Sequence, residues 1–187
     1  QKVKNSSNQK LYYPVDPTSR KDATIGGTIS CNASGFVPGN RGATRYWVNS
    51  LSIVLTSGRI INAKRGQYIS KNGKFLIDND IVVLPSFTRP QIKNASGPFS
   101  FNNDEVDIID LIIGSEGIFG MIVECELILD ELAKNNLDFF IPLDNEDIAI
   151  NFRNYIYKIK EEENFIINAL EYFGHNCQKY MRQNNYF

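Results

Sequence analysis

Two segments of this chain combine glycine with small hydroxyl side chains, a composition that leaves backbone N–H groups accessible. The first, Thr24 to Gly35, has the sequence TIGGTISCNASG, and the second, Gly114 to Gly120, has the sequence GSEGIFG. A tight turn is the simplest explanation for any one glycine, but two such clusters in one chain favour a ligand that approaches the backbone. Exposed N–H and hydroxyl groups suit a pyrophosphate or the edge of a flavin ring.

The spacing of these glycines excludes two familiar phosphate-binding motifs. Neither segment has the Rossmann dinucleotide fingerprint, and neither is a phosphate loop with its Lys-Ser/Thr ending. The residues alone therefore predict cofactor-binding loops without naming the cofactor. Because it is so rich in glycine, Thr24 to Gly35 is expected to form turns rather than a helix.

Composition narrows the class of protein. The 187 residues carry a formal net charge of −1, so no overall field favours a nucleic acid or an acidic membrane surface. Three cysteines without CxxC spacing argue against a disulfide scaffold and a zinc site, and predict free thiols in a reducing, cytoplasmic compartment. The single histidine, His175, excludes a His-rich metal site in this chain. We find no apolar run of the roughly 18–20 residues that a membrane span needs.

The elements that would hold the two segments are mainly strands. Residues 1–10 are polar and are expected to be a linker or a frayed end. Residues 45–63 predict a β-hairpin with its turn at Ser57-Gly58, and residues 64–104 predict loops and short strands. Asp107 to Ile113 could be a short helix or a strand.

A further strand is predicted directly after the second glycine segment. Residues 121–129 alternate apolar and acidic side chains. Such alternation places Glu124 and Glu126 on one face of the strand and Val123, Cys125 and Leu127 on the other.

The pattern changes beyond Glu131. Residues 137–143 and 165–173 each predict a strand, and residues 176–187 predict a short helix. Between the strands, a helix is predicted to begin at Asp144 as N-cap, with Glu146 and Asp147 in its first turn. Its apolar stripe comprises Ile148, Phe152, Tyr155, Ile156 and Ile159. We therefore expect a boundary near residues 131–137, followed by a unit too small to bury a core of its own.

Four motifs occur in the same order as in a known family. They are YYPVDPTS with TIGGTISCNASG, then GATR, then KNASG, and then GSEGIFGMIVE, over residues 12–129. In this respect the chain resembles the FAD-binding domain of vanillyl-alcohol-oxidase-type (PCMH-type) flavoproteins, most of all the D-lactate dehydrogenase and glycolate oxidase subunit branch. The resemblance implies that residues 11–131 form the C-terminal half of that FAD domain and residues 132–187 the start of a cap, or substrate, domain.

The resemblance also implies which residues approach a non-covalently bound FAD. They fall within the two glycine segments and just before the first: Ser19, Thr24, Gly26, Gly27, Ser30, Ser34, Glu116, Gly117, Gly120 and Ile122. No catalytic residue and no metal ligand is assigned. The implied fold class is α+β, a mainly antiparallel sheet flanked by short helices, plus part of a ferredoxin-like cap.

The chain also departs from the family pattern. Ile118 and Phe119 replace the usual Thr-Leu pair, and Asn40-Arg41-Gly42 stands where an aromatic-Gly pair is common. Nothing matches the family's main pyrophosphate loop or the catalytic groups of its cap. We therefore expect a fragment of a flavoenzyme. The intact enzyme would transfer a hydride from a 2-hydroxy acid, such as D-lactate or glycolate, to flavin N5, and the electrons would then pass to an electron acceptor.

Two alternatives remain open at this point: a flavin-free, inactive fragment, and an alkyl-glycerone-phosphate-synthase-like FAD transferase. On any of these interpretations, we expect the chain alone to lack catalysis. Apolar surface left exposed would favour a homodimer.

Overall fold

The chain folds into two compact units in this computed structural model. The first comprises Gln1–Gly35 and Gly39–Leu132, and the second comprises Phe36–Pro38 and Ala133–Phe187. The structure describes residues 11–37, 40–77, 79–85, 105–163, 165–174, 177 and 180. The expected linker at 1–10, the KNASG motif and His175 lie outside these ranges. Across the described residues, no helix is both long enough and apolar enough to cross a membrane.

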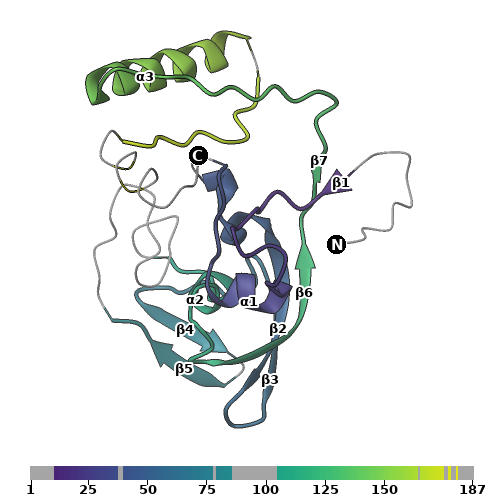
Figure 1. The fold of residues 1–187 in the computed structure, drawn as a ribbon. Coiled ribbons are helices and arrows are strands. Elements are labelled where there is room, and N and C mark those ends of the chain that lie inside the picture. The colour runs from purple at the N-terminus through teal and green to yellow at the C-terminus, as the bar shows by residue number, and fades with distance from the viewer. Residues whose placement is uncertain are drawn as a thin grey trace. The chain divides into compact units, whose positions relative to one another are not determined.

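The first unit is built on an antiparallel sheet with the strand order β3-β2-β6 (Figure 1). Strands β2 (Val48–Leu55) and β3 (Ile60–Lys64) form the predicted hairpin, in which Gly58 takes a φ of 81°. Strand β6 (Gly120–Leu127) pairs with the other edge of β2. The sheet thus brings the end of the second glycine segment next to the hairpin.

Two smaller pairs of strands complete the sheet structure of the described residues. Strands β4 (Lys74–Ile77) and β5 (Asp80–Val83) form a second hairpin, and β1 (Leu11–Tyr12) pairs with β7 (Asp130–Glu131). All of these pairs are antiparallel, which confirms the α+β class with a mainly antiparallel sheet.

Short helices cover the sheet. Helices α1 (Ile25–Ser30) and α2 (Ile108–Ile112) and the 3₁₀ turns η1 (Asn40–Gly42) and η2 (Thr44–Trp47) connect the strands. Helix α2 contacts β2 and β3, and α1 contacts β6 and η2. The core between them is almost entirely aliphatic: Ile29, Val48, Leu51, Ile53, Ile61, Ala63, Phe75, Ile77, Val106, Ile108, Ile109, Ile112 and Ile113. Asp107 to Ile113 is therefore helical over most of its length, which settles the alternative that the sequence left open.

A β-bulge in β6 changes which side chains face the core. Ser52 pairs with Glu124 and Ile53 pairs with Ile122, so Val123 has no partner on β2. The extra residue reverses the alternation, because two consecutive side chains then point away from the core. Val123 is 53 % exposed, and its predicted place beside Cys125 and Leu127 was wrong. Glu124 and Glu126 are exposed, and Cys125 and Leu127 are half-buried, as predicted.

The second unit contains the predicted helix but not the predicted strands. Helix α3 (Glu146–Glu163) has Glu146 and Asp147 in its first turn, as predicted. Its N-cap is Asn145, whose Oδ1 accepts from the N–H of Ile148 at 2.9 Å, rather than Asp144. No side chain of α3 is buried, although Phe152, Ile156 and Ile159 of the predicted stripe are half-buried.

Residues 137–143 and 165–173 form no strand, so both of these predictions were wrong. A strand exists only by pairing with another, and the described part of this unit offers no partner strand. A ferredoxin-like sheet is accordingly not formed among these residues. Of the predicted C-terminal helix, only Cys177 and Tyr180 are described, and both are helical.

Candidate cofactor-binding site

The first glycine segment begins with a capped helix, which corrects the expectation of turns. Thr24 is the N-cap of α1, and its Oγ1 accepts from the N–H of Gly27 at 3.1 Å. The hydroxyl of Thr28 donates to the carbonyl of Ile25, and Ile29 is fully buried. The cap and the buried face outweigh the low helix propensity of the two glycines, as tertiary packing commonly does.

A turn after α1 redirects the rest of this segment. Asn32 takes a φ of 45°, a conformation that asparagine tolerates better than most residues. Ser34 then forms an isolated bridge with Ala43, and Gly35 donates to the carbonyl of Gly42. A Cβ on Gly35 would overlap the backbone of Asp16, so this glycine is required by the close packing of two chain segments.

The second segment follows α2, which is capped by Asp107. The carboxylate of Asp107 accepts from the N–H of Ile109 at 3.0 Å and from the N–H of Gly66 at 2.8 Å. Three positive φ angles come next, at Gly114 (81°), Glu116 (54°) and Gly117 (83°). They fold the chain back sharply before it enters β6.

Hydrogen bonds join the two glycine segments directly. The N–H of Gly114 donates to the carbonyl of Ile29 at 3.0 Å, and the N–H of Glu116 donates to the carbonyl of Ser30 at 2.8 Å. A Cβ placed on Gly26 would lie 3.9 Å from the carbonyl oxygen of Ile122. The predicted cofactor-binding residues of the two segments, which are far apart in the sequence, therefore lie side by side.

The remaining predicted residues lie around this junction or next to it in the chain. Ser19 is in the exposed turn before α1, where its carbonyl accepts from the N–H groups of Asp22 and Ala23. Thr24, Gly27, Ser34, Glu116 and Gly117 are exposed, and Gly26 and Ser30 are half-buried. The surface offers hydroxyl groups and backbone with little side-chain bulk.

Packing explains some of the predicted site glycines but not others. Gly120 has a φ of 153°, and a Cβ there would overlap the carbonyl of Val54, so packing against β2 accounts for this residue. Gly26 and Gly27 are helical, and neither takes a positive φ. A Cβ on Gly26 would make only an ordinary contact with the protein. Packing within the protein therefore does not account for the absence of a side chain at Gly26.

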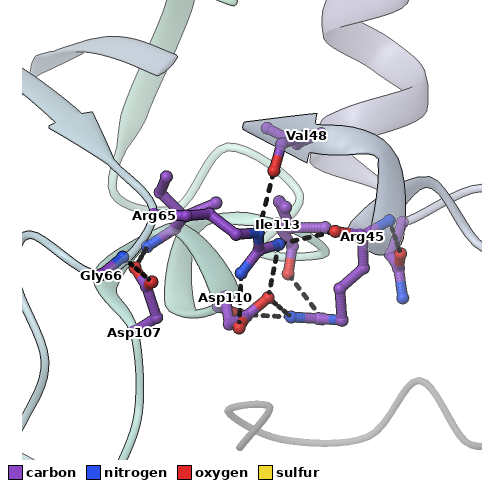
Figure 2. Close-up of polar contacts among 9 residues, drawn as sticks. Arg45, Val48, Arg65, Gly66, Asp107, Asp110 and Ile113 are labelled. Atoms are coloured by element: carbon purple, nitrogen blue, oxygen red, sulfur yellow. Dashed lines mark hydrogen bonds and ion pairs between the residues drawn. The ribbon is translucent and has the colours of Figure 1, made fainter. Parts of the chain in front are cut away.

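Arg45, Arg65 and Asp110 form a buried charge cluster that was not predicted from the sequence. Arg45 and Arg65 both donate to the carboxylate of Asp110, which is fully buried (Figure 2). Burial lowers the pKa of Arg45, and the nearby Asp110 carboxylate opposes that shift. The arginine of the GATR motif was a signal for this cluster, but its partner Asp110 lies in a stretch that could have been helix or strand.

The described residues give less support to a metal site or a disulfide. Among the described residues, no group of three or more His, Cys, Asp or Glu side chains could hold a metal ion. Cys31, Cys125 and Cys177 are free.

Comparison with known proteins agrees with the motifs. A family described as "FAD binding domain" matches residues 2–64. The chain is 30% identical over 148 residues to D-lactate dehydrogenase from Anaerostipes hadrus, an alignment that covers 79% of this chain and 24% of that protein. It is 30% identical over 175 residues to D-2-hydroxyglutarate dehydrogenase from Xanthomonas citri pv. viticola, covering 91% of this chain and 30% of that protein.

A third relative extends the comparison to the oxidases. The chain is 32% identical over 114 residues to glycolate oxidase subunit GlcD from Bacillus subtilis, which covers 61% of this chain and 17% of that subunit. The chain thus spans less than a third of the length of each of these relatives. The chain resembles the FAD binding domain family over residues 2–64, and over the aligned residues it is similar to D-lactate dehydrogenase and to the glycolate oxidase subunit.

Proposed function

We propose that this chain forms one wall of the FAD site of an oxidoreductase that oxidises a 2-hydroxy acid. The junction of the two glycine segments carries this proposal, because hydrogen bonds from Gly114 to Ile29 and from Glu116 to Ser30 unite two motifs that the family resemblance assigns to the same cofactor. The names of the relatives supply the substrate class: D-lactate, D-2-hydroxyglutarate and glycolate are all 2-hydroxy acids.

Each part of the junction has a proposed role. The helix α1 face at Gly26 and Gly27 would lie against the cofactor, with the hydroxyl groups of Ser19, Thr24, Ser30 and Ser34 as hydrogen-bonding groups around it. The turn at Glu116 and Gly117 and the backbone of Gly120 and Ile122 would contact its adenosine side. Bound FAD supplies the acceptor for the hydride that leaves the substrate's α-carbon. This chain would bind and orient the cofactor, and it contributes no proposed catalytic base.

The two units take their proposed identities from the same resemblance. We propose that residues 11–131 are the C-terminal half of the FAD domain and residues 132–187 the beginning of the cap domain. Three free cysteines support a reducing, cytoplasmic location. A homodimer remains a prediction: Ile118, Met121 and Val123, each more than half exposed, would supply apolar contact area, and light scattering of the purified chain tests it.

A titration of the purified chain with FAD tests the cofactor proposal. We expect saturable quenching of flavin fluorescence with low-micromolar affinity. A Gly27→Val variant, which adds bulk to the exposed face of α1, should weaken binding by about tenfold or more. Ser57→Val is the matched control, because it adds an apolar side chain at the exposed hairpin turn between β2 and β3. Absence of binding at high-micromolar FAD by the folded wild-type chain would overturn the proposal.

A further inference from the structure

The side chain of Arg45 reaches the end of helix α2, immediately before the second glycine segment. Its Nη1 donates to the carbonyl of Asp110 at 2.8 Å and to Oδ1 of the same residue at 3.0 Å. Its Nη2 donates to the carbonyl of Ile113 at 3.1 Å. The last carbonyls of a helix lack partners within it, so Arg45 satisfies the C-terminal end of α2. The next residue, Gly114, begins the turn that leads to Glu116.

The backbone of Arg45 holds the turn that follows α1 within the first glycine segment. The N–H of Arg45 donates to Oδ1 of Asn32 at 3.1 Å. The neighbouring Thr44 donates to the carbonyl of Ala33 through both its N–H and its hydroxyl. A Cβ on Gly114 would lie 3.2 Å from the Cβ of Asn32 and 3.7 Å from Nη2 of Arg45. Arg45 thus contacts the turn within the first segment and the residues that immediately precede the second.

The surrounding charges keep Arg45 in this position. Its side chain is 3 % exposed, and the Asp110 side chain that pairs with it is 0 % exposed. Arg65 completes the cluster by donating to both oxygens of Asp110, to the carbonyl of Val48 and to the carbonyl of Arg45 (Figure 2). A guanidinium presents its donors in a rigid planar fork, whereas the ammonium of lysine is a single point. The contacts made by Arg45 therefore require arginine.

We propose that Arg45 is a positioning residue that sets how the two glycine segments lie against each other at the cofactor surface. It does not touch the proposed ligand; it acts through the turns at Asn32 and Gly114. The ligand in this inference rests on the proposed function, but the positioning itself does not. Asp110 supports the arrangement by holding the guanidinium of Arg45 from the side of α2.

Amide hydrogen exchange of the Arg45→Lys variant tests this role without any ligand. The N–H groups of Gly114 and Glu116 donate across the junction, so their exchange reports how well the segments are held. We expect both to exchange about tenfold faster or more, relative to the amides of β2 in the same sample. FAD affinity should fall by a comparable factor. Arg59→Lys, which alters an arginine paired with Asp80 at the surface, is the matched control and should change neither quantity.

A second variant covers the case in which Arg45→Lys fails to fold. Asn32→Gly accepts the positive φ but removes the oxygen that receives the Arg45 N–H, and it should also accelerate exchange at Gly114 and Glu116. The inference is overturned if, in a folded variant, exchange at these two amides relative to the β2 amides is no faster than in the wild-type chain. If instead the wild-type chain binds no FAD while the exchange changes occur, the proposed function fails and the positioning role stands.

Discussion

The N–H of Glu116 donates a 2.8 Å hydrogen bond to the carbonyl of Ser30, and this contact fixes the two glycine segments together. Glu116 makes the bond from a φ of 54°, in the left-handed region that residues other than glycine and asparagine seldom adopt. Its side chain is exposed, so burial does not explain why a glutamate occupies the position. Strain kept at such a place is common at functional sites.

Replacing Glu116 with glycine should therefore stabilise the fold. Glycine adopts positive φ without a Cβ penalty, so we expect Glu116→Gly to raise the free energy of unfolding by about 0.5–1 kcal/mol, after its greater entropy in the unfolded chain is counted. Urea denaturation measures this change. Asn72→Gly, at a φ of 50°, is the control and should change stability less because asparagine tolerates this region. A loss of stability in Glu116→Gly would contradict the strain argument.

Gly120 should tolerate no side chain, for a reason unrelated to the cofactor. Its φ of 153° and the overlap of a Cβ with the carbonyl of Val54 predict that Gly120→Ala lowers the free energy of unfolding by about 3 kcal/mol or more. Gly58→Ala separates the two causes, because Gly58 has a φ of 81° but no atom within 4 Å of an added Cβ. It should cost only about 1 kcal/mol, from backbone strain. Equal losses in the two variants would show that packing against β2 contributes nothing.

The sequence predicted those parts of the fold that depend on local patterns. The β-favouring and apolar residues within 45–63 and the Ser57-Gly58 turn are sufficient to predict the β2–β3 hairpin, and the acidic first turn of α3 marks its start. The failures each needed a contact from elsewhere in the chain. Helix α1 depends on burial of Ile29, and the exposure of Val123 depends on a bulge opposite Ser52 and Ile53.

The candidate site shows the same division. The two glycine segments are visible in the sequence, and the family motifs relate them to one ligand, but nothing local shows that Ser30 and Glu116 are hydrogen-bonded. The cluster of Arg45, Arg65 and Asp110 could not be assembled from the sequence, although the arginine of the GATR motif pointed to one of its members. Charged residues are mostly exposed, so composition gives no signal that one carboxylate will be buried between two guanidinium groups.

A substitution at Gly26 tests whether this glycine is kept for a ligand or for packing. A Cβ there would meet only the carbonyl of Ile122, at 3.9 Å, within a helix where alanine is favoured over glycine. Gly26→Ala should therefore raise the free energy of unfolding by up to about 1 kcal/mol. If the cofactor approaches this residue, the same methyl group should weaken FAD binding by about tenfold. Thermal unfolding and fluorescence titration of one preparation test both, and unchanged affinity would remove Gly26 from the proposed contacts.

Stability should also fall in alkaline solution because of Tyr13. Burial raises the pKa of the Tyr13 phenol above its ordinary value of 10.0. Above about pH 10 the unfolded chain ionises this group while the folded chain keeps it protonated, so the stability present below that pH is lost as the pH rises through the folded pKa. Burial likewise raises the pKa of Cys125 above 9.0 and adds to the loss. Urea unfolding between about pH 8 and pH 11, the range of these titrations, should show the free energy of unfolding decline. The Tyr13→Phe variant should show a shallower decline. A Tyr13→Phe profile parallel to that of the wild type would contradict the assignment to Tyr13.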